Sequence, residues 1–322
     1  MTAVHTNYSS EQHVLDNVHQ AFISSKTVAN ILAKVKPPPN RQVVDMPVTA
    51  TMEEALDLLL AEDILSVPVY RWENNQKKYI TIVSVLDLLK LFVSQASLSD
   101  PNVLLKPISE AIGQTAESST LVTVQVTDSL SYIIDLFGQH GTHRVLVQAE
   151  EGLILLSQMD VIRYLHAHNH HLGRILDITA PAVIERARMK RGNSSSHEPV
   201  TTITFKSTAF DVFLKMAHNP RITALPIVDD DGIFVGDLSP QDLRGLNRER
   251  FDALAKPVVM YLKFSHGDIY PAFTCHNRFT LSQIMAAMVL RKAYRLWLCD
   301  DQGHVEGVIV SDRKPYKLGA ND

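Results

Sequence analysis

Four serines recur along the chain at a near-constant interval, and each directly follows a short apolar segment. They are Ser84, Ser157, Ser239 and Ser311. An aspartate stands three residues after each of the first three serines, at Asp87, Asp160 and Asp242. In the fourth copy this place is taken by Lys314. A turn that leads from a strand into a helix can hold a polar ligand at the helix N-terminus. The Ser-x-x-Asp pattern can also simply cap the helix, and the two functions do not exclude each other.

The spacing of these serines indicates an internal repeat, because the intervals are 73, 82 and 72 residues. The longer middle interval contains residues 185–200, ERARMKRGNSSSHEPV, a basic and then serine-rich segment without apolar periodicity. This composition predicts a loop insertion in the third repeat. A solvated loop also explains the basic residues better than a patch that binds nucleic acid or lipid.

An amphipathic helix is predicted upstream of each serine, because apolar residues recur there at i, i+3, i+4 and i+7. The four sets are Met52, Ala55, Leu56, Leu59; Leu130, Ile133, Ile134, Phe137; Phe210, Phe213, Leu214, Ala217; and Leu281, Ile284, Met285, Met288. A β-prone segment precedes each helix, two strands follow it, and a second helix begins after the serine. Each repeat is therefore predicted to be an α+β unit of strand, helix, strand, strand, helix. Because about 60 residues form only a marginal core, we expect the units to pair within residues 28–168 and 172–318.

The composition disfavours several classes of function. The 322 residues are 45% hydrophobic and 20% charged, with a net charge of −4 and an isoelectric point near 6.4. Such a chain has no global positive field to attract nucleic acid or an anionic membrane. Cys275 and Cys299 are too few and too far apart to indicate a zinc site or a disulfide framework, so we expect them to fill core space in a reducing compartment. With no secretory leader and no apolar run of membrane-spanning length, the chain is expected to be cytosolic or nuclear.

The repeat resembles the cystathionine-β-synthase (CBS) domain. The resemblance rests on SVPVY at 66–70, ALPIV at 224–228 and the closing Ser-x-x-Asp turn. Among proteins with four such copies, the chain most resembles the γ subunit of AMP-activated/SNF1-type protein kinases, through THRVLV at 142–147, PRITALPIVDDDG at 220–232 and AYRLWLCDDQG at 293–303. The resemblance implies an α+β fold of four CBS repeats, packed as two Bateman modules in a flattened disk. The corresponding boundaries are an N-terminal extension at 1–27 and repeats at 28–98, 107–168, 172–248 and 254–318.

In that family, adenine nucleotides bind in clefts between paired repeats. A ribose presents two neighbouring hydroxyls, which suit the carboxylates of the turns, and phosphates are best held by guanidinium groups. The implied ribose-binding residues are Asp87, Asp160, Asp242, Ser84, Ser157 and Ser239. The implied phosphate-binding residues are His143, Arg144, Arg221 and Arg295. The implied adenine pocket is formed by Ile64, Val67, Ile222, Ala224 and Leu225.

Each of these assignments has a structural alternative. The arginines can form surface salt bridges, and the apolar residues more often belong to a core than to a binding site. Tyr294 replaces a histidine expected in the fourth repeat, and Lys314 cannot accept hydrogen bonds from ribose hydroxyls. The fourth site therefore departs from the family, and the occupancy of the sites cannot be copied from it.

We expect a non-catalytic regulatory subunit that senses AMP, ADP and ATP and contacts the catalytic α-type and scaffold β-type subunits of a kinase. Beyond these regulatory ligands no cofactor is expected, and neither is a nucleic-acid or membrane partner. The alternative is a stand-alone nucleotide-binding regulator of another partner, such as a phosphatase. A third hypothesis is an enzyme with a metal held by the histidines of YLHAHNHHLGR at 164–174, but no acidic or thiolate ligand is evident there. No GxSxG, P-loop, HExxH or kinase motif is present, so neither a catalytic residue nor a metal site is predicted.

Overall fold

The computed structural model of the chain describes residues 18–39, 42–95, 100–138, 141–189, 200–219, 221–267 and 272–310. These ranges contain the three Ser-x-x-Asp turns and nearly all of the predicted repeat elements. Ser311, Lys314 and residues 190–199 lie outside them. The predictions for the fourth turn and for most of the insertion therefore stay predictions.

The first repeat shows how the sequence produces the common unit. Its elements are β1 (Met46–Pro47), α4 (Met52–Ala61), β2 (Ser66–Glu73), β3 (Gln76–Ser84) and α5 (Val85–Gln95). Helix α4 begins where the side chains of Thr51 and Glu54 form a capping box, and the predicted apolar stripe that starts at Met52 is fully buried. Strand β1 pairs with β2 in parallel, and β2 pairs with β3 antiparallel, so the sheet order is β1-β2-β3.

The other repeats place their strands in the same way. The second contains β4 (Thr123–Gln125), α7 (Leu130–Phe137), β5 (Arg144–Ala149), β6 (Gly152–Ser157) and α8 (Gln158–Ala167). The third contains β7 (Ile203–Thr204), α10 (Ala209–His218), β8 (Leu225–Val228) and β9 (Phe234–Leu238). The fourth contains β10 (Thr274–Cys275), α12 (Leu281–Leu290), β11 (Arg295–Cys299) and β12 (Val305–Val310). The order strand, helix, strand, strand is thus confirmed in all four repeats, each with its own three-stranded sheet.

Short helices connect these units. The α-helices among them are α2 (Val18–Ser24), α3 (Val28–Val35), α6 (Ala116–Ser119), α9 (Ala180–Met189) and α11 (Val258–His266). The 3-10 helices are η1 (Pro101–Leu105), η2 (Ile108–Ala111), η3 (Asn169–His171), η4 (Gly173–Asp177), η5 (Pro240–Leu243) and η6 (Arg248–Ala255). Within the described ranges, none of the helices has the length and apolar character needed to cross a membrane.

The third repeat departs from the prediction in its first helix. The stripe predicted to start at Phe210 is only partly right. Phe213 is buried and Phe210, Leu214 and Ala217 pack against the core, but the other fully buried residues of α10 are Ala209, Val212 and Met216. The side chain of Thr208 accepts a hydrogen bond from the backbone N–H of Asp211, so the helix begins at Ala209. The cap fixes where the helix begins, and packing against the core decides which of the residues that satisfy the helical spacing are buried most deeply.

Two predicted segment types around this repeat are also wrong. The closing helix expected after Ser239 is instead the short 3-10 helix η5, because the chain turns at Gly245 with φ of +74°, a conformation that favours glycine. Helix α9 continues to Met189, so residues 185–189 of the predicted loop insertion are helical.

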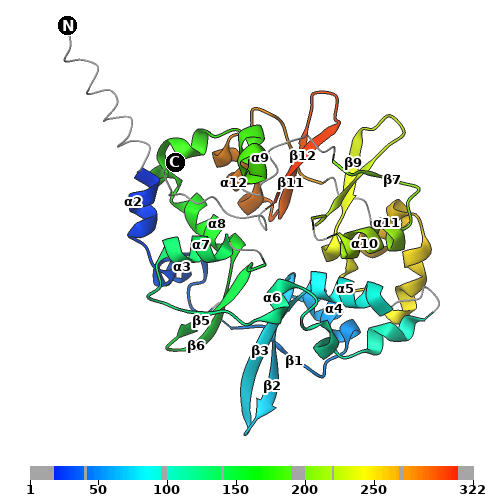
Figure 1. Cartoon of the computed structure of the whole chain (residues 1–322), viewed down its shortest axis with the longest axis horizontal. Coiled ribbons are helices and arrows are strands. Elements are labelled where there is room, and N and C mark those ends of the chain that lie inside the picture. Colours follow the sequence, from blue (N-terminus) through cyan, green and yellow to red (C-terminus); the bar gives the residue numbers. More distant parts are fainter. Residues whose placement is uncertain are drawn as a thin grey trace.

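The four repeats lie around a ring when the molecule is viewed down its shortest axis (Figure 1). The sheet of the first repeat lies beside that of the second, and the sheets of the third and fourth repeats form the other pair. Helices join the two pairs: the Phe92 ring of α5 packs 6.2 Å from Phe210 and 5.9 Å from Phe251, measured between centroids. Met285 of α12 packs in the core of the second repeat. The flattened disk of two paired modules is therefore confirmed.

Candidate functional site

The three Ser-x-x-Asp turns have the same internal geometry. One carboxylate oxygen, Oδ2, accepts a hydrogen bond from the backbone N–H of the serine, at 2.8 Å for Asp87, 2.9 Å for Asp160 and 2.7 Å for Asp242. The same oxygen accepts a second hydrogen bond from the hydroxyl of that serine in each turn. The capping function predicted from the sequence is therefore confirmed in all three repeats.

The second oxygen, Oδ1, points to a different partner in each turn. For Asp87 it accepts a hydrogen bond from the hydroxyl of Ser118 at 2.5 Å. For Asp160 it accepts one from the Arg163 guanidinium at 3.2 Å. For Asp242 it lies 3.0 Å from Nε2 of His266. The cap thus leaves one oxygen of each carboxylate for a donor outside the turn.

Two of these donors come from the other repeat of the pair, from the helix ahead of its first strand. Ser118 is the penultimate residue of α6, ahead of β4, and His266 ends α11, ahead of β10. Lys36, which follows α3 and precedes β1, places its ammonium 3.2 Å from Oδ2 of Asp160. Sequence reasoning missed these residues. A serine, a lysine and a histidine are chemically different, so no common motif marks their equivalent positions in the repeats.

The aspartates are buried despite being charged residues. Asp87 is 0% exposed, Asp160 is 1% exposed and Asp242 is 8% exposed. A buried carboxylate is tolerated when its oxygens accept hydrogen bonds, and each of the three does so at both oxygens. A ligand hydroxyl that reached Oδ1 would therefore have to replace a protein donor.

The predicted phosphate-binding arginines differ in their surroundings. Arg144 begins β5, and its guanidinium donates to the Glu117 carboxylate of α6 at 3.0 Å. Arg295 begins β11 and donates to Asp237 of β9 at 3.0 Å, and the indole N–H of Trp297 donates to the same oxygen. Arg221 is exposed, three residues ahead of Ala224. Arg144 and Arg295 therefore form ion pairs, but these pairs are largely buried and not the surface salt bridges of the alternative prediction.

His143 contributes a buried nitrogen beside this ion pair. Its backbone N–H donates to the other oxygen of the Glu117 carboxylate at 3.3 Å. Its ring nitrogen Nδ1 is buried, and no hydrogen-bond partner for it lies among the described residues. A buried polar atom without a partner is unusual, so this nitrogen is available to a ligand that reaches it.

Charged groups from several repeats gather around Tyr294 of the fourth repeat. Burial raises the pKa of the Tyr294 hydroxyl, and Arg144, Arg163, Arg244 and Asp63 exert smaller electrostatic effects on the same pKa. The Arg244 guanidinium of the third repeat donates to Asp63 of the first at 3.3 Å. The tyrosine that replaces the expected histidine is thus within electrostatic reach of charged side chains from the other three repeats.

The predicted adenine pocket is mostly core. Val67 and Leu225 are each 1% exposed and belong to the large apolar core shared by the first and third repeats. Ile64 and Ile222 pack at the edge of that core, and Ala224 is buried. Their assignment to a ligand stays a prediction.

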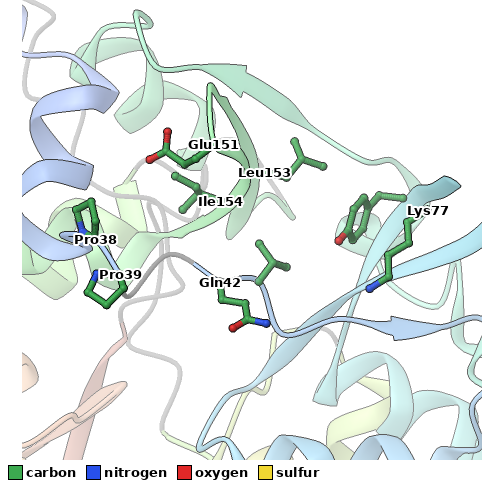
Figure 2. A pocket seen from close by; sticks show the side chains of 9 residues that line it. Pro38, Pro39, Gln42, Lys77, Glu151, Leu153 and Ile154 are labelled. Atoms are coloured by element: carbon green, nitrogen blue, oxygen red, sulfur yellow. The ribbon is translucent and has the colours of Figure 1, made fainter.

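A cavity of about 720 Å³ lies elsewhere, between the hairpins of the first and second repeats (Figure 2). It is lined by Pro38, Pro39, Gln42, Val43, Lys77, Tyr79, Glu151, Leu153 and Ile154. No residue predicted to bind ribose, phosphate or adenine lines it. Lys77 pairs with Asp45 at 2.8 Å, and Glu151 adds a negative charge, so the lining does not favour a phosphate.

The histidine-rich segment packs as an aromatic cluster. The rings of His168 and His171 lie 5.7 and 4.8 Å from the ring of Phe22 in α2. Within the described residues, no group of three or more histidine, cysteine, aspartate or glutamate side chains is arranged to hold a metal ion.

Comparisons with known proteins agree with this architecture. A family model of the CBS domain matches residues 33–94 and 196–248, which include the turns at Ser84 and Ser239. The crystal structure of protein MJ1225 from Methanocaldococcus jannaschii, a proposed archaeal homologue of g-AMPK, covers 87% of this chain and 96% of its own, with a TM-score of 0.64 at 17% identity. Two segments of the chain thus match the CBS domain, and the chain as a whole shares the fold of protein MJ1225.

Relatives in sequence point in two directions. The chain is 23% identical to the 5'-AMP-activated protein kinase subunit gamma of Saccharomyces cerevisiae, with 97% of each chain covered. It is 24% identical to the SNF1-related protein kinase regulatory subunit gamma-like PV42a of Arabidopsis thaliana, over 87% of this chain and 92% of that protein. It is 20% identical to Protein SDS23 of Candida albicans over 84% of this chain, which spans 49% of that longer protein. The chain is therefore similar to γ-type kinase subunits and to SDS23.

Proposed function

We propose that the chain is a non-catalytic regulatory subunit of an AMP-activated/SNF1-type protein kinase complex, and that it senses adenine nucleotides in the clefts between paired CBS repeats. The similarity to the yeast γ subunit along 97% of both chains supports this assignment. Catalytic α-type and scaffold β-type subunits would then be its protein partners. The regulatory output follows if AMP, ADP and ATP bind with different affinities to alternative states of the complex.

The main observation behind the proposal is how the two oxygens of each turn carboxylate are used. In each turn Oδ2 is used by the cap, while Oδ1 accepts a donor from outside the turn. A ribose hydroxyl is a donor of the same kind, so it can take this place without disturbing the start of the helix. Asp242 is the best candidate of the three, because it is the most exposed of them.

Calorimetric titration of the full chain with AMP and with ATP tests nucleotide binding. We expect Asp242→Ala to weaken binding at that cleft at least tenfold. The matched control is Asp211→Ala. Asp211 also accepts a hydrogen bond from the hydroxyl of a helix-capping residue, Thr208, but it is exposed and lies outside the Ser-x-x-Asp turns. If the wild-type chain binds neither nucleotide, the proposal is wrong.

The second candidate is a stand-alone CBS regulator of another partner, which the similarity to Protein SDS23 favours. Co-purification from cells separates the two functions. Recovery of kinase catalytic and scaffold subunits supports the kinase complex, and their absence together with recovery of a phosphatase supports the alternative.

A further inference from the structure

Helix α6 joins the two predicted binding elements of the first pair of repeats. Its residue Glu117 contacts Arg144 and the backbone N–H of His143, and the adjacent residue Ser118 donates its hydroxyl to Asp87. Two neighbouring side chains of one short helix therefore reach both the phosphate-binding and the ribose-binding candidates of this cleft.

These contacts have the chemistry of a bound nucleotide. A phosphate binds a guanidinium and backbone N–H groups, and the Glu117 carboxylate accepts from one of each. A ribose hydroxyl donates to a carboxylate, as the Ser118 hydroxyl donates to Asp87. The Arg144 and Glu117 side chains are only 13% and 6% exposed, so the pair is largely shielded from water.

Helix α6 is held firmly in this position. The Thr81 hydroxyl of β3 donates to the Ser118 carbonyl at 2.8 Å, and the backbone N–H of Gly113 donates to the Ser118 hydroxyl at 3.0 Å. The helix also packs closely on Gly141, where a Cβ atom would lie 2.4 Å from the Cβ of Ala116. These contacts fix the position of α6 against the first and second repeats.

We propose that Glu117 and Ser118 are a built-in occupant of the cleft between the first and second repeats, and that Glu117 makes this cleft select against phosphate-bearing ligands. A nucleotide would bring a second anion to an arginine that already has a buried carboxylate partner, and it would have to displace the Ser118 hydroxyl from Asp87. Nucleotides therefore bind the wild-type chain at other clefts. This inference rests on the proposed function.

The second pair of repeats lacks the equivalent bridge among its described residues. There Asp242 contacts His266 of α11, whereas Arg295 contacts Asp237 of β9, so the two partners come from different elements. A ligand hydroxyl at Asp242 has to replace the His266 ring, but it can do so without displacing the carboxylate partner of Arg295. The two modules consequently differ in their access to nucleotides.

Nucleotide stoichiometry of the full chain, measured by calorimetry with ATP and AMP, tests the inference. Glu117→Gln keeps the shape of the side chain but removes its charge. We expect this variant to bind one more nucleotide per chain than the wild type does. The affinity at the cleft between the first and second repeats should rise at least tenfold. The double change Glu117→Gln with Arg144→Lys should lose most of that gain, because lysine cannot form the guanidinium contact. Glu110→Gln, which removes an exposed carboxylate, is the matched control and should add no site.

Hydrogen exchange of the wild-type chain provides a test that needs no variant. We expect saturating ATP to change exchange at residues 115–119 less than twofold. The inference is overturned if exchange there changes more than tenfold on nucleotide binding, or if Glu117→Gln leaves the stoichiometry of a nucleotide-binding wild type unchanged. If the wild type binds no nucleotide and Glu117→Gln does, the proposed function and binding at other clefts fail, while the exclusion of phosphate-bearing ligands by Glu117 stands.

Discussion

At the scale of single residues, burial has different consequences for the three turn carboxylates. Asp87 is fully buried, and its two oxygens accept hydrogen bonds from Ser84 and Ser118. Asp160 faces two cations, Lys36 and Arg163, so its charge is compensated directly. The same residue type in the same local motif is therefore stabilised by neutral donors in one repeat and by ion pairs in another.

Asp87→Ala is expected to destabilise the protein strongly. The change leaves the buried Ser84 N–H and the Ser118 hydroxyl without their acceptor, at a cost of about 3 kcal/mol. Urea denaturation monitored by circular dichroism measures this loss. Asp301→Ala, at an exposed turn, should change stability by no more than about 0.5 kcal/mol. A loss below about 1 kcal/mol for Asp87→Ala would show that the network around it contributes little.

The two thiols provide a pH-dependent prediction. Burial raises the pKa of the Cys275 thiol to about 12, with a smaller contribution from the nearby Cys299. Burial also raises the pKa of the Cys299 thiol to about 11, with smaller contributions from the negative charges of Asp300 and Glu306. Both thiols therefore stay protonated near neutral pH, and at pH 8 they should react with a disulfide reagent about a hundredfold more slowly in the folded than in the urea-unfolded chain. Their contribution to stability is present below about pH 9 and is lost as the pH rises toward 11 to 12. Equal rates in the folded and unfolded chain would contradict the prediction.

At the scale of elements, N-caps fix where the first helix of each repeat begins, and a turn at Gly245 follows the short 3-10 helix that closes the third repeat. Helices α4, α7, α10 and α12 begin after Thr51, Ser129, Thr208 and Thr280, whose side chains accept the first backbone N–H groups. The turn after η5 depends instead on Gly245, whose N–H donates to the Leu56 carbonyl of α4. A Cβ atom at Gly245 would lie 2.5 Å from Cδ2 of Leu60. This turn therefore docks the third repeat on a helix of the first.

Gly245→Ala tests that docking. The new methyl group meets Leu60 and the backbone has φ of +74°, so both contact and conformation oppose it. Gly113→Ala is the matched control, because its φ is +86° but no atom lies within 4 Å of the new Cβ. We expect Gly245→Ala to be about 1–3 kcal/mol more destabilising than Gly113→Ala in chemical denaturation. Equal losses would mean that Leu60 moves aside without cost.

At the scale of the whole molecule, the pairs defined by the sheets are not the units defined by the cores. The largest core cluster combines residues of the first and third repeats, which belong to different sheet pairs. The core of the second repeat includes α3, from residues 28–35, together with Met285 of the fourth. Because each core crosses between the two pairs, the disk should unfold as one cooperative unit.

Phe92→Ala tests this cooperativity. Phe92 is fully buried, and its ring contacts Phe210 and Phe251. Its removal should cost about 3–5 kcal/mol. Calorimetry should still show a single transition, shifted to lower temperature, whereas Leu290→Ala at a side chain 76% exposed should leave the transition nearly unchanged. Two separate transitions in either protein would show that the modules unfold independently.

Much of the fold could be predicted from local sequence. Periodic apolar residues, β-prone segments and turn residues act over a few positions, so the repeat and its element order were accessible without a structure. The most deeply buried face of α10 was not, since two overlapping sets of residues fit the helical spacing and only packing against the core decides between them. The loss of the closing helix in the third repeat depends on how Gly245 meets Leu60 of another repeat.

By itself, the sequence determined that this protein has four similar repeats and that three turns carry a Ser-Asp pair, because these features depend on residues close together along the chain. Only the tertiary structure decided what each carboxylate and arginine faces. Ser118 lies 31 residues from Asp87, and His266 lies 24 residues from Asp242. Such partners are chosen by how helices pack between repeats, and no local spacing records that packing. The ion pair between Glu117 and Arg144, 27 residues apart, is likewise a product of that tertiary arrangement.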